Sequence, residues 1–412
     1  MKRILASSWM LFFACFLGLG LFWSLVPESR RPPAWGDYAG FYRPAAQKIL
    51  DGRGIHGLTY PPGEPAFLAA AYFCADRIGA DRDATVVWMQ SLCHALGAAL
   101  VVALSAAVVG RPKSVLAGWA WAVYPPAVWM IGLPGSSELP FLVWLLGSVW
   151  LFWTAVERED SIVLWRLFCA GACLGAAMLF RPIALPLPLV FALFLLLRAK
   201  RPIGRRVVLP IGVFLFAVFL TILPWEGWVY AKHGKIIPLS SNGPASIADG
   251  LAFATTRQGE VVLPVSPEIQ AVMVDLRRQD IDRKLQTNAD IAAWVRRQMT
   301  EHPKAMLQIL GMKVLRCWYG TDSHRHESSV LLVHLVYVGL SLIGMGLACR
   351  RNASLRRLAL LVVLLVLCNW GMASLVLPIA RYMAPVMPLL VIWIPAVVFS
   401  VPGETAGDRA VS

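Results

Sequence analysis

Long apolar segments alternate with short polar connections along almost the whole chain. Ten of these segments approach or exceed the roughly 20 residues that a helix needs to cross a bilayer. Their boundaries are 5–26, 84–109, 113–133, 138–157, 163–180, 182–198, 206–228, 329–349, 355–376 and 382–401. The pattern therefore predicts an all-α polytopic membrane protein with about ten transmembrane helices.

The composition agrees with this class. Hydrophobic residues make up 58% of the 412 positions, the mean hydropathy is +0.63, and only 15% of residues are charged. Soluble domains carry about 25% charged residues. The net charge of +14 would suggest nucleic acid in a soluble protein. Here the Lys and Arg residues flank apolar segments, where they orient helices and attract anionic headgroups. We therefore expect the basic residues to contact membrane lipids, and we expect no nucleic-acid partner.

The basic connections orient the predicted helices. Lys and Arg cluster at 1–3, 111–113, 198–206 and 350–357, and such clusters are typically cytoplasmic. Residues 65–80 are apolar enough to suggest another crossing, but that crossing would move two of the basic clusters outside. We therefore expect this segment to lie in the outer interface or to be re-entrant, with both termini cytoplasmic.

The chain is predicted to form a single membrane-embedded domain over residues 1–402, followed by a disordered tail at 403–412. Two segments are exposed on the outer side in this topology: a first loop at 27–83 and a large loop at 231–327. The large loop contains 13 basic and 10 acidic residues, so it is not a patch of one sign.

Two helix starts are expected inside the large loop. Ser266 is followed by Pro267 and Glu268, a typical helix N-terminus. Pro303 precedes a second stretch with an amphipathic pattern, which we expect to form a helix resting on the membrane surface.

Four charged residues outside this loop fall at the outer face in this topology: Asp37, in the loop after the first span, and Glu138, Arg181 and Arg381 at the ends of spans. Charges near membrane depth are costly, so they are candidates for a functional site. Each carboxylate could simply cap a helix. Alternatively, the two could share a divalent cation or divide base and binding roles. Each arginine could bind a phosphate through its guanidinium or extend to the interface without a partner.

The stretch "GDYAGFYRPAAQKILDGRG" at 36–54 follows the first span. Its apolar and aromatic positions recur at helical spacing and predict a short helix that ends near Gly52. These positions are Tyr38, Tyr42, Ala45, Ala46, Ile49 and Leu50.

No standard motif supports a nucleotide or zinc site. His324 and His326 in "SHRHE" do not match a zinc pattern and are more simply read as a solvated loop edge. The candidates for a divalent cation are therefore Asp37 with Glu138, and His324 with His326, and no other cofactor is predicted. The sequence shows no P-loop and no inverted repeats of a transporter.

Six motifs in chain order resemble those of the C-type glycosyltransferases (GT-C). They are the Asp37 loop quoted above, "YPPGEPAFLAAAYF", "GSSELPFLVWLLGSVWLF", "LFRPIALPLPL", "LPWEGWVYAKHGKIIPLSSNGPASIADG" and "RYMAPVMPLL". The resemblance runs from about residue 5 to 400. It is nearest to the family 39, PMT-like bacterial branch, which includes the aminoarabinose transferase of lipid A. One departure is Glu226-Gly227-Trp228, where the family has Arg-Asn after Pro-Trp.

The resemblance implies transfer of a sugar from a polyprenyl-phosphate donor to an acceptor hydroxyl, with inversion, on the outer side of a bacterial inner membrane. It implies Asp37 as the catalytic base, and Glu138 is expected as its helper. The donor phosphate is expected at Arg381 and Arg181 and, more weakly, at Lys232 and Lys235. The expected substrate contacts are Tyr38, Tyr42, Arg43, Tyr60 and Tyr382.

The acceptor stays open between a glycan, a lipid and a protein. Two other functions also stay open: a lipid or polymer transporter or flippase, and a non-catalytic assembly partner. Substitution of Asp37 separates them, because only an enzyme needs a base at that position.

Overall fold

The structure is a computed structural model that describes residues 2–32, 36–55, 57–157, 162–198, 204–257, 260–261, 265–399 and 401. The predicted tail at 403–412 lies outside these residues. Helices dominate the described chain, and a two-residue antiparallel hairpin pairs β1 (Thr256–Arg257) with β2 (Glu260–Val261).

All ten predicted spans coincide with apolar helices. Within the described ranges, seven helical segments are long and apolar enough to cross a membrane: Ser8–Leu25, Arg82–Val109, Glu138–Val156, Val207–His233, Glu327–Arg351, Leu355–Leu375 and Ala380–Val398. An eighth span is a pair of helices, Arg111–Ala122 and Pro125–Ile131, that bends by 62°. Two shorter apolar helices, Leu164–Phe180 and Pro182–Arg198, account for the remaining two predictions. The protein is thus a multi-pass membrane protein.

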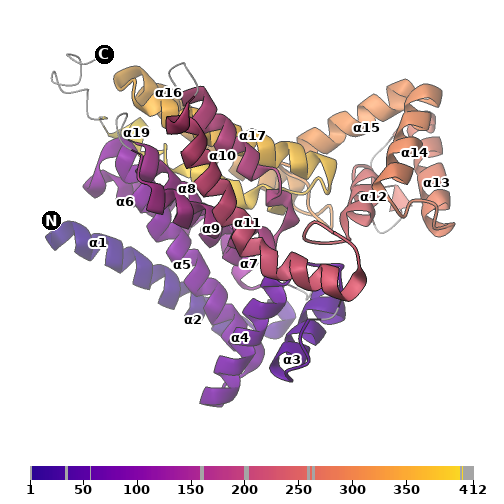
Figure 1. Cartoon of the computed structure of the whole chain (residues 1–412), viewed down its shortest axis with the longest axis horizontal. Coiled ribbons are helices and arrows are strands. Elements are labelled where there is room, and N and C mark those ends of the chain that lie inside the picture. Colours follow the sequence, from indigo (N-terminus) through magenta and orange to yellow (C-terminus); the bar gives the residue numbers. More distant parts are fainter. Residues whose placement is uncertain are drawn as a thin grey trace.

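The first span is α1 (Lys2–Phe13) and α2 (Leu19–Leu25), joined by a π-helical turn. The bundle continues with α5 (Arg82–Val109), α6 (Arg111–Ala122), α7 (Pro125–Ile131), α8 (Glu138–Val156), α9 (Leu164–Phe180), α10 (Leu187–Arg198) and α11 (Arg205–His233). It closes with α16 (Glu327–Arg351), α17 (Leu355–Leu375), α18 (Met387–Val391) and α19 (Pro395–Val398). Figure 1 shows α5 and α8 inside this bundle.

Small residues let α9 pack closely against α11. Gly171 and Gly175 stand four residues apart on one face of α9, and a Cβ on either would collide with α11, at Phe214 and Thr221 respectively. This small-xxx-small spacing lets two helix backbones approach each other where lipid gives little hydrophobic drive for packing. The contact fixes the end of α9, from which Arg181 follows.

The first loop folds into helices that lie beside the bundle. It contains the short helix η2 (Glu28–Arg30), the π-helical turn η3 (Tyr38–Tyr42), α3 (Arg43–Leu50) and α4 (Gly63–Ile78). The short helix predicted at 38–50 is thus present, with a π-turn at its start, and Gly52 follows it at φ +69°. α4 is not among the candidate spans of the described chain, in agreement with the prediction that 65–80 does not cross.

The large loop forms a helical unit with its own apolar core. Its helices are α12 (Gly243–Phe253), α13 (Pro267–Ile281), α14 (Asn288–Glu301) and α15 (Pro303–Arg316), which gather at one end of the molecule (Figure 1). Both predicted helix starts are confirmed. The Ser266 hydroxyl accepts the N–H of Ile269 at the start of α13, and α15 begins at Pro303.

The unit is tied to the bundle by Lys313 on α15. Its ammonium donates to the carbonyl of Leu375 at 2.8 Å, at the end of α17. Carbonyls at a helix C-terminus lack intrahelical partners and attract a positive charge. Lys313 therefore holds the end of α17, and with it the start of the segment that leads to Arg381.

Candidate functional site

A cavity of about 760 Å³ lies between the first loop, the large loop and the bundle. Its lining comes from within residues 37–61, 134–138, 180–185, 236–249, 286–288 and 372–382. Predicted site residues that meet there are Asp37, Tyr38, Tyr42, Tyr60, Glu138, Arg181, Arg381 and Tyr382. The charged residues that the topology placed at one end of the spans are thus neighbours in space.

Four of these residues form what we call the arginine cluster: Glu138, Arg181, Arg381 and Tyr382. The Glu138 carboxylate lies 2.5 Å from Nη1 of Arg181 and 3.5 Å from Nε of Arg381. The ring of Tyr382 contacts both guanidinium groups, with centroid distances of 4.4 Å to Cζ of Arg181 and 5.6 Å to Cζ of Arg381. Two cations share one carboxylate, so the cluster keeps one net positive charge and can bind an anion.

Glu138 was read from the sequence as a capping acid or a second carboxylate for Asp37. At the start of α8, no side-chain capping bond is formed by the N-cap residue Ser137. The hydroxyl of Ser136 instead donates to the second oxygen of Glu138 at 3.1 Å. The carboxylate is therefore engaged by arginine and serine side chains.

Asp37 lines the same cavity from the beginning of the first-loop helix. It has helical backbone angles and makes no capping bond through its side chain in the described chain, so the alternative reading of a helix cap is wrong. Its carboxylate accepts a hydrogen bond from the Tyr60 hydroxyl. Burial, and then the negative charge of Asp37, raise the pKa of Tyr60, which keeps this hydroxyl a donor.

Tyr38, the residue after Asp37, anchors the helix on the opposite side. Its hydroxyl donates to Asp83 at 2.6 Å and meets the Tyr72 hydroxyl at 2.8 Å. Its ring packs on Gly135, which has φ +71°, and a Cβ there would come within 2.8 Å of the ring. These contacts on both sides of Tyr38 fix where Asp37 enters the cavity.

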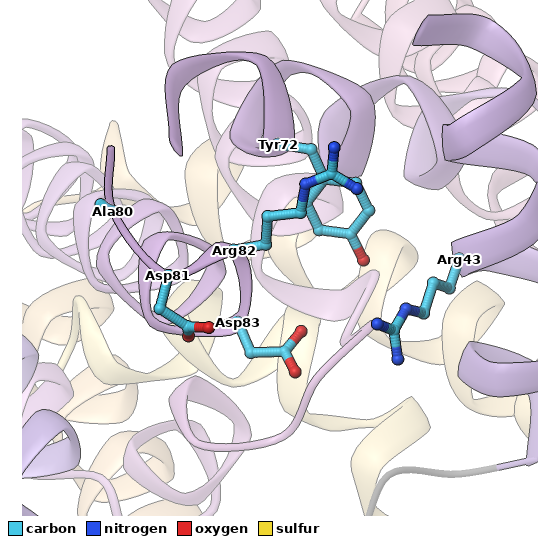
Figure 2. Close-up of a pocket in the computed structure, with 6 residues that line it drawn as sticks. All are labelled: Arg43, Tyr72, Ala80, Asp81, Arg82 and Asp83. Carbon is cyan, nitrogen blue, oxygen red and sulfur yellow. The ribbon is translucent and has the colours of Figure 1, made fainter. Parts of the chain in front are cut away.

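Asp83 and Tyr72 belong to a second, smaller pocket of about 270 Å³. Figure 2 shows the Arg82 guanidinium stacked over the Tyr72 ring and the Arg43 side chain directed toward the same space. Arg43 thus lines this smaller pocket and is not among the described residues that line the main cavity with Asp37.

The remaining predicted residues also fall outside the described lining of the main cavity. Lys232 lies over the ring of Trp228 at the end of α11, and Lys235 lies just after that helix. His324 contacts Arg316 and Glu327. Among the described residues, no group of three His, Cys, Asp or Glu side chains is arranged to hold a metal ion.

Glu226, which departs from the family pattern, shapes a wall of the cavity. One of its carboxylate oxygens accepts the N–H of Leu239 at 2.8 Å, and the indole of Trp225 donates to the carbonyl of the same residue at 3.1 Å. Leu239 has φ +63°, a left-handed conformation that costs free energy for a branched side chain. Both the N–H and the carbonyl group of Leu239 are thus hydrogen-bonded to side chains of α11.

The sequence reasoning also missed the polar wall that the large loop presents. Ser240, Asn242, Asp249 and Asn288 line the cavity opposite the bundle. Desolvation, and then the charges of Asp280 and Asp37, raise the pKa of Asp249, which places its carboxylate near that of Asp37. The stretch "LSSNGPASIADG" was the available signal for Ser240, Asn242 and Asp249, whereas no motif marked Asn288.

Comparisons with known proteins agree with the motif-based resemblance. Residues 61–225 match the family model described as dolichyl-phosphate-mannose-protein mannosyltransferase. No curated protein matches the chain in sequence. Among solved structures, the chain resembles the archaeal oligosaccharyltransferase AglB from Archaeoglobus fulgidus, in complex with an inhibitory peptide and a dolichol-phosphate, with a TM-score of 0.55 and 10% identity.

That alignment covers 98% of this chain and 53% of AglB, so the chain spans about half the length of that protein. ArnT from Cupriavidus metallidurans, bound to undecaprenyl phosphate, aligns with a TM-score of 0.44, 13% identity and coverage of 96% and 77%. At this score the second likeness carries no weight. The chain therefore has a C-type glycosyltransferase fold, and residues 61–225 carry the sequence pattern of the dolichyl-phosphate-mannose-protein mannosyltransferase family.

Proposed function

We propose that this protein is a glycosyltransferase that moves a sugar from a polyprenyl-phosphate donor to an acceptor hydroxyl, with inversion at the anomeric carbon. The observation that carries the proposal is that Asp37 and the arginine cluster line the same cavity. The reaction requires a base and an anion-binding site within one cavity.

The donor phosphate is assigned to the arginine cluster. Arg181 and Arg381 are prepositioned by Glu138, so little rearrangement is needed when an anion binds. The cavity is also apolar beside the cluster, where Ile183, Leu185 and Leu377 line it. Leu185 is 43% exposed on the bundle surface, so a polyprenyl chain can continue from here into the bilayer.

Asp37 is assigned as the base. Its carboxylate would take the proton of the acceptor hydroxyl as that oxygen forms a bond to the anomeric carbon. The bond between the anomeric carbon and the phosphate oxygen breaks at the same time, and polyprenyl phosphate leaves with an additional negative charge. Arg181 and Arg381 stabilise that charge. Tyr60 keeps the Asp37 carboxylate oriented through its hydrogen bond.

The polar wall of the large loop is assigned to sugar hydroxyl groups of the acceptor or the donor. Asn242, Asp249 and Asn288 offer both donors and acceptors of hydrogen bonds there. We place this cavity on the periplasmic side of a bacterial inner membrane, within one membrane-embedded domain at 1–402, because the basic connections lie at the opposite ends of the predicted spans.

The proposal is tested with purified protein in lipid, a panel of radiolabelled polyprenyl-phosphate sugars and a membrane-extract acceptor pool. Wild type is expected to transfer label from one donor class. Asp37→Asn is expected to lose nearly all turnover, by a factor of about 10² to 10⁴, while it still binds the donor. Asp51→Asn, a change in the same loop outside the described cavity lining, serves as the control.

Two outcomes would contradict the proposal. Transfer by Asp37→Asn at the wild-type rate would remove the base from its role. A labelled lipid that crosses the bilayer without any sugar transfer would favour the transporter or flippase, because that activity needs no base at Asp37.

A further inference from the structure

Glu64 is a buried carboxyl behind the arginine cluster. It lies in the first turn of α4 and is 1% exposed. Neither of its oxygens has a hydrogen-bond partner among the described residues. Burial of an ionised carboxylate without a partner costs several kcal/mol of free energy. Such a group is therefore normally protonated and neutral.

The backbone approaches closely at this point. A Cβ on Gly63 would come within 2.6 Å of the Leu179 carbonyl oxygen and 2.8 Å of the Phe180 ring. α4 therefore begins directly against the last turn of α9, which Arg181 follows. This packing places the Glu64 carboxyl beside the cluster and away from water.

The titratable and charged groups that face Glu64 come from every element packed around it. They are Tyr42 of η3, Cys93 of α5, Glu138 of α8 and Arg181 at the end of α9. Arg181 attracts a negative charge on Glu64, whereas Glu138 repels one. Burial, and then the charge of Glu138, raise the pKa of Glu64 to about 8 against the opposing effect of Arg181.

We propose that Glu64 is a positioning residue that sets the charge around Arg181 in the arginine cluster: as a neutral acid it leaves Arg181 to Glu138 and the donor phosphate, and as an anion it competes with that phosphate for Arg181. The inference rests on the proposed function, since it assigns the donor phosphate to the cluster. It adds a group outside the described cavity lining that acts through Arg181.

The two states of Glu64 differ by one charge beside the phosphate. With the acid neutral, two guanidinium groups and the Glu138 carboxylate sum to +1, which matches the single negative charge of a phosphodiester. With Glu64 ionised, the sum is zero and the attraction for the donor is lost. Donor affinity should therefore fall as pH rises through about 8.

The test measures binding of farnesyl methyl phosphate, a phosphodiester whose charge is constant over this range, to the full chain in lipid nanodiscs. For wild type we expect the Kd to rise about tenfold between pH 7 and pH 9, because about one molecule in eleven keeps the proton one unit above the pKa. Glu64→Gln, a neutral isostere, should bind with nearly the same Kd at both values. Glu301→Gln, an exposed change on α14, should follow wild type.

A rise in Kd that is equal in wild type and Glu64→Gln would overturn the role of Glu64 while leaving the donor site intact. Failure of wild type to bind the phosphodiester at any pH would instead overturn the donor site, and with it both proposals.

A second measurement without ligand tests the buried acid by itself. The folded chain keeps a proton that the unfolded chain releases above about pH 4.3. The unfolding temperature of wild type should therefore fall relative to Glu64→Gln as pH rises from 5 to 8, and not further above 8. A constant difference over that range would show that Glu64 is ionised in the folded state and would overturn the inference.

Discussion

Glu138 and Arg181 form an ion pair of 2.5 Å in which the two side chains are 2% and 10% exposed. The pair joins the start of α8 to the residue that follows α9. Arg381, from the last part of the chain, contacts the same carboxylate. Glu138 therefore holds together two cations that would otherwise repel each other beside the cavity.

Removal of Glu138 is expected to destabilise the protein. Glu138→Ala leaves the buried Arg181 and the partly buried Arg381 without their shared partner, and loss of one side of a buried pair costs about 3–5 kcal/mol. The measurement is reversible unfolding in detergent. Asp51→Asn is the matched control, because its exposed pair with Arg53, at 3.9 Å, should contribute under about 1 kcal/mol. Equal losses in the two variants would contradict this account.

Arg381→Ala is expected to weaken donor binding. A phosphate that loses one charged hydrogen-bond partner loses about 1.5–3 kcal/mol, which corresponds to a rise in Kd of roughly 10- to 150-fold. Arg381→Lys should recover part of this affinity, since it keeps the charge without the planar fork. Unchanged affinity in a folded Arg381→Ala protein would remove this residue from the phosphate site.

The contact between Tyr38 and Asp83 is expected to position Asp37. Tyr38→Phe keeps the packing on Gly135 but loses the hydroxyl, so kcat should fall while the Kd of the donor stays unchanged. Asp83→Asn should have the same signature, and the double variant should cost little more than either change alone. Steady-state kinetics with donor titration separates these quantities. Additive losses would show that the two residues act independently.

Glu226→Ala is expected to loosen the cavity wall that Leu239 belongs to. The N–H of Leu239 would lose its acceptor, and the left-handed turn would no longer be held by α11. We expect the KM of acceptor or donor to rise by roughly fivefold, with increased proteolysis near residue 239 as an independent measurement. Leu239→Gly in the Glu226→Ala background should restore the KM in part, because glycine adopts this conformation without strain.

The membrane architecture was predictable because crossing a bilayer imposes a length and a composition on each helix. Counting basic connections was enough to bring Asp37, Glu138, Arg181 and Arg381 to one end of the bundle. The positions of the basic connections also predicted that the segment of α4 does not cross the membrane, although its apolar sequence alone suggested a crossing.

Side-chain partners were not predictable in the same way. Tyr42 and Arg43 were both expected to contact substrate, yet adjacent residues of a helix point in different directions, so Tyr42 lines the main cavity and Arg43 lines the smaller pocket. Glu138 could be read as a cap because its neighbours along the chain are serines, whereas its partners are arginines distant in sequence. Glu64 lies within the quoted motif "YPPGEPAFLAAAYF", but the motif did not show that its carboxyl is buried, because that burial depends on the contact between α4 and the end of α9.

The cavity draws its walls from the first, middle and final parts of the chain. Ribosomes release these parts in order, so the loop with Asp37 is made long before Arg381 and Tyr382. The α17–α18 connection supplies the last two wall residues, and Lys313 can fasten α17 only after the large loop has folded. The cavity is therefore complete only after the last helices have been made, well after the first spans can enter the membrane.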